Sequence, residues 1–114
     1  MKTVSQIISV TFVLILAVAN LNAQGATAAI SGTVFDPTGA AIPGASITVK
    51  NVGTSFTRNI VSDDQGRYLA PELPIGMYEV QGSLAGFQTV VRRNIELTVG
   101  SHPVVDLHMA IGKA

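Results

Sequence analysis

Apolar and polar residues alternate along two early segments of the chain, residues 30–35 and residues 46–50. Because side chains of a strand point to opposite faces in turn, this period of two places Ile30 and Val34 together on one face. Residues 36–39 read Asp-Pro-Thr-Gly, a sequence typical of a turn. The Asp side chain can accept a hydrogen bond from the backbone ahead, Pro fixes φ, and Gly tolerates a positive φ. The pattern predicts two strands joined through a turn.

Further strand signals follow at intervals of about ten residues, each closed by turn residues, which is typical of a β-sandwich. The sequence contains no convincing helical pattern after residue 23. Two prolines between residues 71 and 76 exclude a central strand there, because each removes a backbone donor. Arg92 and Arg93 are expected at a bend that divides residues 89–99 into two shorter strands. The remaining predicted strands are residues 57–62, 68–70, 77–84 and 105–109. We therefore predict one all-β domain, a sandwich of seven antiparallel strands.

The alternation also predicts which side chains fill the space between the sheets. Glycines 39, 66 and 86 are expected at turns or corners where a β-carbon would clash. The predicted core residues are Ile30, Val34, Ile47, Val49, Ile60, Tyr68, Leu73, Tyr78, Val80, Leu97, Val105 and Leu107.

The first 23 residues have a different composition from the rest. Lys2 precedes an apolar run from Ile7 to Ala19, and a polar stretch with small residues ends at Ala23. This layout is typical of a secretory signal peptide. The run of 13 residues is short of the about 20 that span a bilayer, so cleavage after Ala23 is favoured over a retained anchor. We predict a signal peptide at 1–23, a flexible leader at 24–28 and the domain at 29–111.

Composition excludes several classes of function. Beyond Ala23 the chain has six Lys or Arg and seven Asp or Glu, a net charge of −1. That balance gives no basic field for nucleic acid or anionic lipid, and membrane insertion of the mature domain is not expected. The chain has no cysteine, so no disulfide stabilises it despite the predicted export.

Several short motifs, in this order and spacing, resemble the carboxypeptidase regulatory-like domain, a transthyretin-like (prealbumin-like) sandwich of the carbohydrate-binding-like fold group. They are Ile30-Ser31-Gly32-Thr33-Val34, Asp36 with Gly39, Pro43-Gly44-Ala45 before Ile47 and Val49, Asp63 with Gly66 and Tyr68, Leu73-Pro74 with Gly76, Tyr78 and Val80, and Gly86-Phe87. The resemblance covers about residues 28–110 and implies Greek-key topology.

A signal peptide followed directly by this domain is similar to the N-terminus of Oar-like TonB-dependent outer-membrane receptors. In that group the domain precedes a plug and a barrel, neither of which is present in these 114 residues. The residues leave open whether the chain is free-standing or a truncated receptor, and its oligomeric state is also open.

The family name suggests a peptidase, but the residues do not support one. A zinc peptidase needs a local pair of His and Glu ligands, another His and a Glu base. The chain has only His102 and His108, neither with a Glu within four residues, and both are expected on the surface. We predict no catalytic residue, no cofactor and no metal.

A calcium ion is the alternative for Asp36, Asp63 and Asp64, because hard cations bind several carboxylate and carbonyl oxygens. Each aspartate, however, precedes a glycine by two or three residues, where its carboxylate caps backbone N–H groups. Turn capping is therefore the favoured interpretation.

Carbohydrate binding is the alternative function, because sugar rings stack on exposed aromatic faces. The chain has no Trp, and Tyr68 and Tyr78 fall on the inward register. Phe35 and Phe56 are the candidate platforms that remain.

Together these observations predict a non-catalytic, exported module of the cell envelope with a structural or interaction role. The expected location is the periplasm, the outer-membrane surface or the exterior. Expected partners are another envelope protein, a receptor barrel or a polysaccharide.

Overall fold

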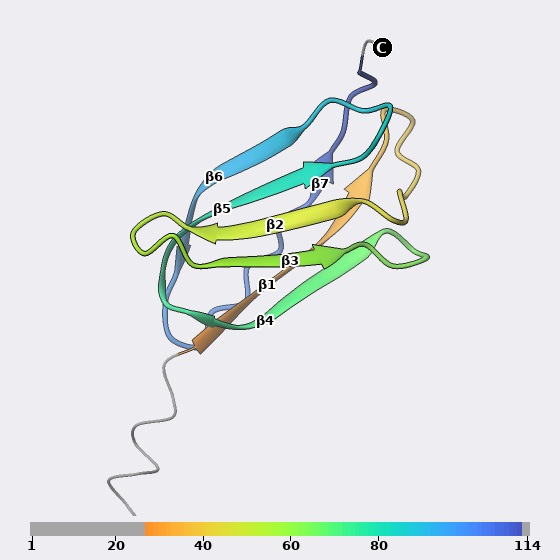
Figure 1. The fold of residues 1–114 in the computed structure, drawn as a ribbon. Coiled ribbons are helices and arrows are strands. Elements are labelled where there is room, and N and C mark those ends of the chain that lie inside the picture. The colour runs from red at the N-terminus through yellow and green to blue at the C-terminus, as the bar shows by residue number, and fades with distance from the viewer. Residues whose placement is uncertain (1–26, 113–114) are drawn as a thin grey trace, which may run out of the picture.

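The computed structural model describes residues 27–112, which form seven strands and no helix. The predicted signal peptide lies outside the described residues, as does the predicted leader up to residue 26. The strands are β1 (Thr27–Phe35), β2 (Ser46–Asn51), β3 (Thr57–Val61), β4 (Arg67–Pro74), β5 (Gly76–Ser83), β6 (Val90–Leu97) and β7 (Leu107–His108). They build a three-stranded sheet, β4-β1-β7, and a four-stranded sheet, β3-β2-β5-β6 (Figure 1). The predicted all-β class and the strand number are confirmed.

The four-stranded sheet is antiparallel throughout, as the alternation predicted. Its one irregularity lies in β6, where Tyr78 is opposite Ile95 but Val80 is opposite Arg92. Asn94 adopts a φ of 61° in this bulge. The prediction of two shorter strands divided at Arg92 and Arg93 is wrong, because the bulge bends β6 without ending its pairing with β5.

The three-stranded sheet corrects the prediction of an entirely antiparallel fold, because β1 and β7 are parallel. The pairing extends past the two residues of β7 on both sides, because residues 101–109 run alongside β1 and form backbone hydrogen bonds with it. They run from Ala29 N to Ser101 O (3.1 Å), Ser31 N to Pro103 O (3.2 Å), Val105 N to Ser31 O (2.7 Å) and Met109 N to Phe35 O (2.8 Å). Between them, Thr33 N donates to Asp106 Oδ1 at 2.9 Å. At Thr33 the acceptor is therefore a side-chain oxygen, where its neighbours bond to backbone oxygens. As a result, β7 is only Leu107–His108, shorter than the strand predicted at residues 105–109.

Strand β4 continues through both prolines to Pro74, although residues 71–76 were expected to interrupt the strands. It lies at the edge of its sheet, where a missing donor costs least. Ala28 is opposite Leu73 and Ile30 is opposite Ala70, so β4 accommodates an extra residue in a bulge. Glu72 has a φ of 54° there. The prolines therefore bend an edge strand instead of ending it.

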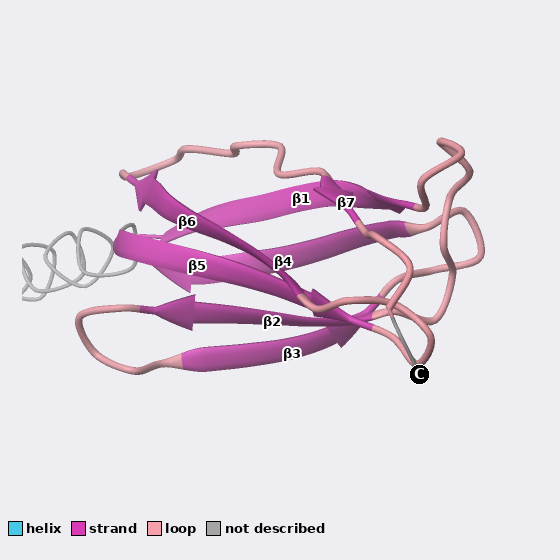
Figure 2. Cartoon of the chain, turned by 90° about the horizontal axis from the view of Figure 1, so that it is seen from above, coloured by secondary structure: helices cyan, strands magenta, loops and turns pink. Residues whose placement is uncertain are grey.

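The core lies between the two sheets, which Figure 2 shows as separate layers. Every predicted core residue is buried except Ile60, which is half-buried against the core. Ile60 lies on β3, which is at the edge of its sheet and has a neighbouring strand, β2, on one side only. Among residues 27–112, the buried polar side chains are Asn51 and Ser62, and both form hydrogen bonds: Asn51 accepts from Gly53 N, and Ser62 donates to Ile42 O.

Glycines 39, 66 and 86 have φ values of 86°, 75° and 90°, so their predicted position at turns is confirmed. The predicted clash holds only for Gly66, whose β-carbon would lie 2.9 Å from that of Ala41. Gly39 and Gly86 have open space, and only their φ favours glycine. The severe clash is at Gly32, where a β-carbon would lie 2.0 Å from the carbonyl oxygen of Val105.

The chain enters and leaves the sandwich at opposite ends. At the entry pole, Thr27 begins β1 and its carbonyl accepts from Gly100 N at 3.0 Å. At the exit pole, Gly112 N donates to the carbonyl of Gly86, in the connection from β5 to β6 (3.0 Å). In Figure 1 the start of β1 and the end of the described chain accordingly lie at opposite ends of the sandwich.

Candidate functional site

The aspartates in the turns cap backbone groups. Asp36 Oδ1 accepts from Thr38 N (2.8 Å), Thr38 Oγ1 (2.6 Å) and Ala40 N (3.0 Å). The Thr38 hydroxyl is the main cause that lowers the pKa of Asp36. Asp63 Oδ1 accepts from the backbone of Gln65 and Arg67, each at 2.9 Å, whereas Asp64 is exposed. Within residues 27–112, no group of three or more His, Asp or Glu side chains is arranged to hold a metal ion.

The two tyrosines serve the fold. Tyr68 Oη donates to the carbonyl of Val105 and so joins β4 to the segment before β7. Tyr78 Oη donates to the carbonyl of Pro74 at 2.7 Å. Burial, with a smaller contribution from the Asp106 carboxylate, raises the pKa of Tyr68 above its ordinary value. Both hydroxyls therefore donate bonds that hold the fold together.

The two histidines are exposed and belong to different parts of the last segment. His108 stacks on Phe35, with ring centroids 5.2 Å apart and an interplanar angle of 18°. His102 lies directly before Pro103 in the connection from β6 to β7. The arrangement gives neither histidine an acid partner or a nucleophile among the described hydrogen bonds.

The structure does not bring Phe35 and Phe56 together. Phe35 is the last residue of β1, near the exit pole. Phe56 lies near the other pole, where its carbonyl accepts from the N–H of Asn51 (2.7 Å), the last residue of β2. Phe35 is half-buried beside His108. Phe56 packs against the core, and the guanidinium of Arg58 lies 5.4 Å from its ring centroid. The two rings are separate candidate positions and not one platform.

Arginines bridge both open sides of the sandwich. On one side, Arg58 of β3 donates to the carbonyl of Pro71 in β4. On the other, Arg92 of β6 donates to the carbonyl of Asp106, just before β7, at 3.0 Å. Each arginine joins an edge of the four-stranded sheet to an edge of the three-stranded sheet. Edges of this kind otherwise offer unpaired backbone groups to other chains.

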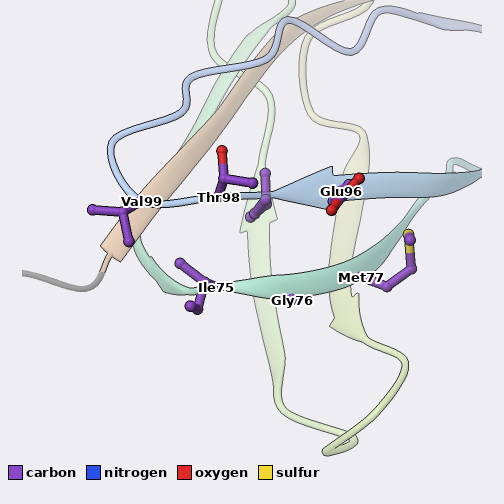
Figure 3. A pocket seen from close by; sticks show the side chains of 7 residues that line it. Ile75, Gly76, Met77, Glu96, Thr98 and Val99 are labelled. Carbon is purple, nitrogen blue, oxygen red and sulfur yellow. The ribbon is translucent and has the colours of Figure 1, made fainter.

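The entry pole carries an open apolar groove of about 520 Å³ between the β4–β5 turn and the end of β6 (Figure 3). Ile75, Met77 and Val99 line it, 46%, 42% and 63% exposed, over buried Leu97. Val52, 51% exposed, adjoins Met77 through a backbone bond of 2.9 Å. These four exposed side chains form what we call the apolar pole.

The sequence pattern did not identify the apolar pole. Residues 95, 97 and 99 were placed in one register, yet β6 ends at Leu97 and Val99 is exposed in the following turn. The available signal was an aliphatic residue directly before a glycine, which occurs at Val52, Ile75 and Val99. Turn positions ordinarily hold polar residues.

No helix capable of crossing a bilayer occurs in the described part of the chain.

Fold and surfaces together define a small two-layer β-sandwich domain with structural tyrosines and bridged edges. A family profile for the carboxypeptidase regulatory-like domain matches residues 29–110. The chain therefore belongs to the carboxypeptidase regulatory-like domain family. No curated protein matches the chain.

Solved structures share the fold at low sequence identity. The TIE protein of Bacillus anthracis is 24% identical, with a TM-score of 0.64, over 75% of this chain and 17% of that one. A mutant catechol 1,2-dioxygenase of Acinetobacter radioresistens is 14% identical, with a TM-score of 0.66, over 81% of this chain and 54% of that one. The dioxygenase domain of a dioxygenase–carbohydrate-binding protein fusion from Streptomyces sp. SirexAA-E is 11% identical, with a TM-score of 0.60. The match covers 77% of this chain and 82% of that one.

This chain spans about one sixth of the first of these proteins and about half of the second. At such identities the likeness concerns the fold alone.

Proposed function

We propose that this chain is a non-catalytic, exported structural and interaction module of the cell envelope. Its action is to place one segment at a fixed distance from another and to offer surfaces to a neighbouring envelope protein. Asp36 and Asp63 accept bonds from turn backbone, Tyr68 and Tyr78 donate to backbone carbonyls, and His108 stacks on Phe35.

The observation that carries this proposal is the position of the two ends of the domain. The chain enters beside Gly100 at one pole and leaves beside Gly86 at the other. Strands of eight or nine residues separate the poles, about 27 Å at the usual rise. A domain of this form inserts in line between neighbouring segments as a rigid spacer. The resemblance of leader plus domain to the N-terminus of TonB-dependent receptors supports the same role.

Cell fractionation with mass spectrometry of the N-terminus tests the proposal. We expect a chain that begins at Gln24, recovered from the periplasmic, outer-membrane or secreted fraction. A chain that keeps residues 1–23 and remains in the cytoplasm would contradict it. Replacing Leu14 and Leu16 by Arg interrupts the apolar run and should abolish both export and processing.

Carbohydrate binding is the second candidate, and Phe35 is favoured over Phe56 as its platform because Phe35 is not among the residues packed against the core. Phe56 has the Arg58 guanidinium near its ring and packs on the core. Polysaccharide pull-down compares Phe35→Ala with Phe56→Ala. Loss of retention by Phe35→Ala alone would support a sugar site at Phe35, and undiminished retention by both variants would refute these sites.

A further inference from the structure

The two sheets end in four outer strands, and three of these edges carry features that hinder pairing with another chain. In β4, Pro71 and Pro74 supply no backbone donor, and the bulge at Glu72 bends the strand. The carbonyl of Pro71 is also occupied, because it accepts from Arg58. The edge formed by β4 is therefore a poor template for a further strand.

The edges formed by β6 and by the last segment are protected in similar ways. Strand β6 contains the bulge with Asn94 and the exposed pair Arg92 and Arg93. The last segment contains Pro103, and its carbonyl at Asp106 accepts from Arg92 at 3.0 Å. Prolines, bulges and charged side chains are the means by which sheets keep their edges from pairing. These two edges are therefore closed to a regular ladder as well.

Strand β3 has none of these features. Its pairing with β2 runs without interruption from Val61 opposite Ser46 to Thr57 opposite Lys50. No residue of β3 is proline or glycine, and none has a positive φ. Its one charged side chain, Arg58, leaves the plane of the sheet to reach β4. Figure 2 shows β3 as the outermost strand of its layer, so its free edge stays accessible.

The bonds at the two ends of β3 show which backbone groups point away from β2. Asn51 N donates to Phe56 O at 2.7 Å, and Ser62 N donates to Ala45 O at 2.9 Å. In an antiparallel pair, every second residue turns its N–H and C=O toward the neighbouring strand. The residues of β3 that turn these groups outward are therefore Thr57, Asn59 and Val61.

We propose that β3 pairs with β3 of a second copy of this chain, antiparallel and about a two-fold axis at Asn59. The two four-stranded sheets then join into one sheet of eight strands. This dimer goes beyond the proposed function and does not depend on it, because the pairing uses only groups within the described domain.

The sequence of β3 suits pairing with itself. With Asn59 opposite Asn59 of the second copy, Thr57 lies opposite Val61, and the two chains exchange about six backbone bonds. Arg58 lies opposite Ile60, so no like charges meet across the axis. Val61, 64% exposed, gains a β-branched neighbour in Thr57. A two-fold interface of this kind needs no surface other than the strand itself.

The dimer should be weak and reversible. A strand of five residues buries far less than the about 800 Å² per partner of a stable interface, so we expect a dissociation constant on the order of 100 μM. Sedimentation equilibrium on the protein purified from the cell fraction that contains it measures this constant. A native chain that stays monomeric up to about 1 mM would overturn the proposal.

Val61→Pro distinguishes this edge from other contacts. It removes an N–H that points away from β2, so the pairing of β2 with β3 is kept while the new ladder is interrupted. Val61→Thr is the matched control, because it keeps both the N–H and a β-branched side chain. Association should weaken at least about tenfold in Val61→Pro and stay near native in Val61→Thr. Equal association of both variants would overturn the proposal, and circular dichroism checks that both are folded.

Engineered cysteines test the axis without a proline, because the chain has no cysteine of its own. The two Asn59 Cα atoms would lie about 5.5 Å apart, which suits a disulfide. Glu96→Cys, exposed on β6 at the other edge of the same sheet, is the control. Under mild oxidation, Asn59→Cys should form disulfide-linked dimers at least about tenfold faster than Glu96→Cys. Equal rates would overturn the proposal.

The same cysteine variants separate a second copy from another occupant when oxidation is performed in intact cells. Linkage of Asn59→Cys to a copy of itself supports the proposal. Linkage to a different protein, without self-linked dimers, would overturn it and assign the edge to a foreign strand. Cell fractionation is independent of these results, so a monomeric chain in the envelope removes only this inference, whereas a dimeric chain in the cytoplasm removes only the proposed function.

Discussion

The two sheets of this sandwich are built by different means. The four-stranded sheet is a run of antiparallel ladders in which β2 pairs with β3 and β5, and alternation alone decides which side chains point inward. The three-stranded sheet joins the first strand to the last segment of the chain in parallel. It depends on a glycine, a tyrosine hydroxyl and an aspartate side chain at single positions.

The two sheets should therefore respond differently to substitution. Pairing in the four-stranded sheet is spread over many equivalent backbone bonds, so one changed side chain is tolerated. In the three-stranded sheet, Gly32 admits the carbonyl of Val105, and Tyr68 donates to that same oxygen. We expect substitutions around this carbonyl to distinguish the sheets most clearly.

Gly32→Ala should have the largest effect, a destabilisation above about 4 kcal/mol. Its β-carbon would lie 2.0 Å from the oxygen of Val105, and a backbone atom cannot yield without separating residues 101–109 from β1. Gly82→Ala in β5 is the matched control, because its β-carbon would meet side-chain atoms and no backbone atom, with Leu107 Cδ1 at 2.9 Å and Val90 Cγ1 at 3.4 Å. It should cost about 1–3 kcal/mol. Urea unfolding measures both, and equal losses would remove the distinction between the sheets.

Tyr68→Phe should cost about 1–3 kcal/mol, because the carbonyl of Val105 loses a donor in a buried position. Tyr78→Phe is the comparison in the four-stranded sheet, where the carbonyl of Pro74 loses its donor. The response of Tyr68→Phe to pH provides a second measurement. Burial raises the pKa of Tyr68 above the ordinary 10.0, so the folded state keeps a proton that the unfolded state releases.

The stability from this shift is fully present below pH 10.0 and is lost as pH rises toward the folded-state pKa of Tyr68. Urea unfolding at about pH 8 and about pH 11 measures the loss. The native chain should lose stability over this interval, and Tyr68→Phe should lose less. An identical loss in both chains would show that Tyr68 does not carry the alkaline sensitivity.

The smallest effects are expected at the arginine bridges between the sheets. Arg58→Ala and Arg92→Ala should each cost about 0.5–1 kcal/mol, because both bonds are exposed to solvent. Arg93→Ala, an exposed neighbour in β6, is the control and should be near neutral. Light scattering during prolonged incubation is the second measurement. Faster association of the Arg93 variant than of the other two would contradict a role for the bridges in guarding the edges.

The sequence predicted the parts of the fold that local alternation encodes. Ile47, Val49, Tyr78 and Val80 are buried as expected, because β2 and β5 are central strands with a strict period of two. Ile60 shows the same alternation but lies on β3, at the edge of the sheet. Local alternation does not indicate whether a strand is central or at an edge. The parallel course of residues 101–109 depends on pairing with β1, about 70 residues away, and alternation carries no information about strand direction.

Candidate surfaces were harder to predict than the core. Phe35 and Phe56 were selected because exposed aromatic rings suit sugars, and the sequence could not state that they lie at opposite ends. The apolar pole was missed because it assembles from three connections, after β2, between β4 and β5, and after β6, together with Met77 at the start of β5. Each of the four contributes one apolar residue that carries no signal alone.

The parallel pairing of β1 with the last segment has a mechanical consequence. The two strands leave the sandwich at opposite poles, so tension applied to the chain ends would draw them past each other along their length. Their mutual bonds, from Ala29 to Met109, would be sheared together instead of opening one after another. Stretched between two attachment points, the domain should yield only at high force, and single-molecule pulling would record one abrupt rupture.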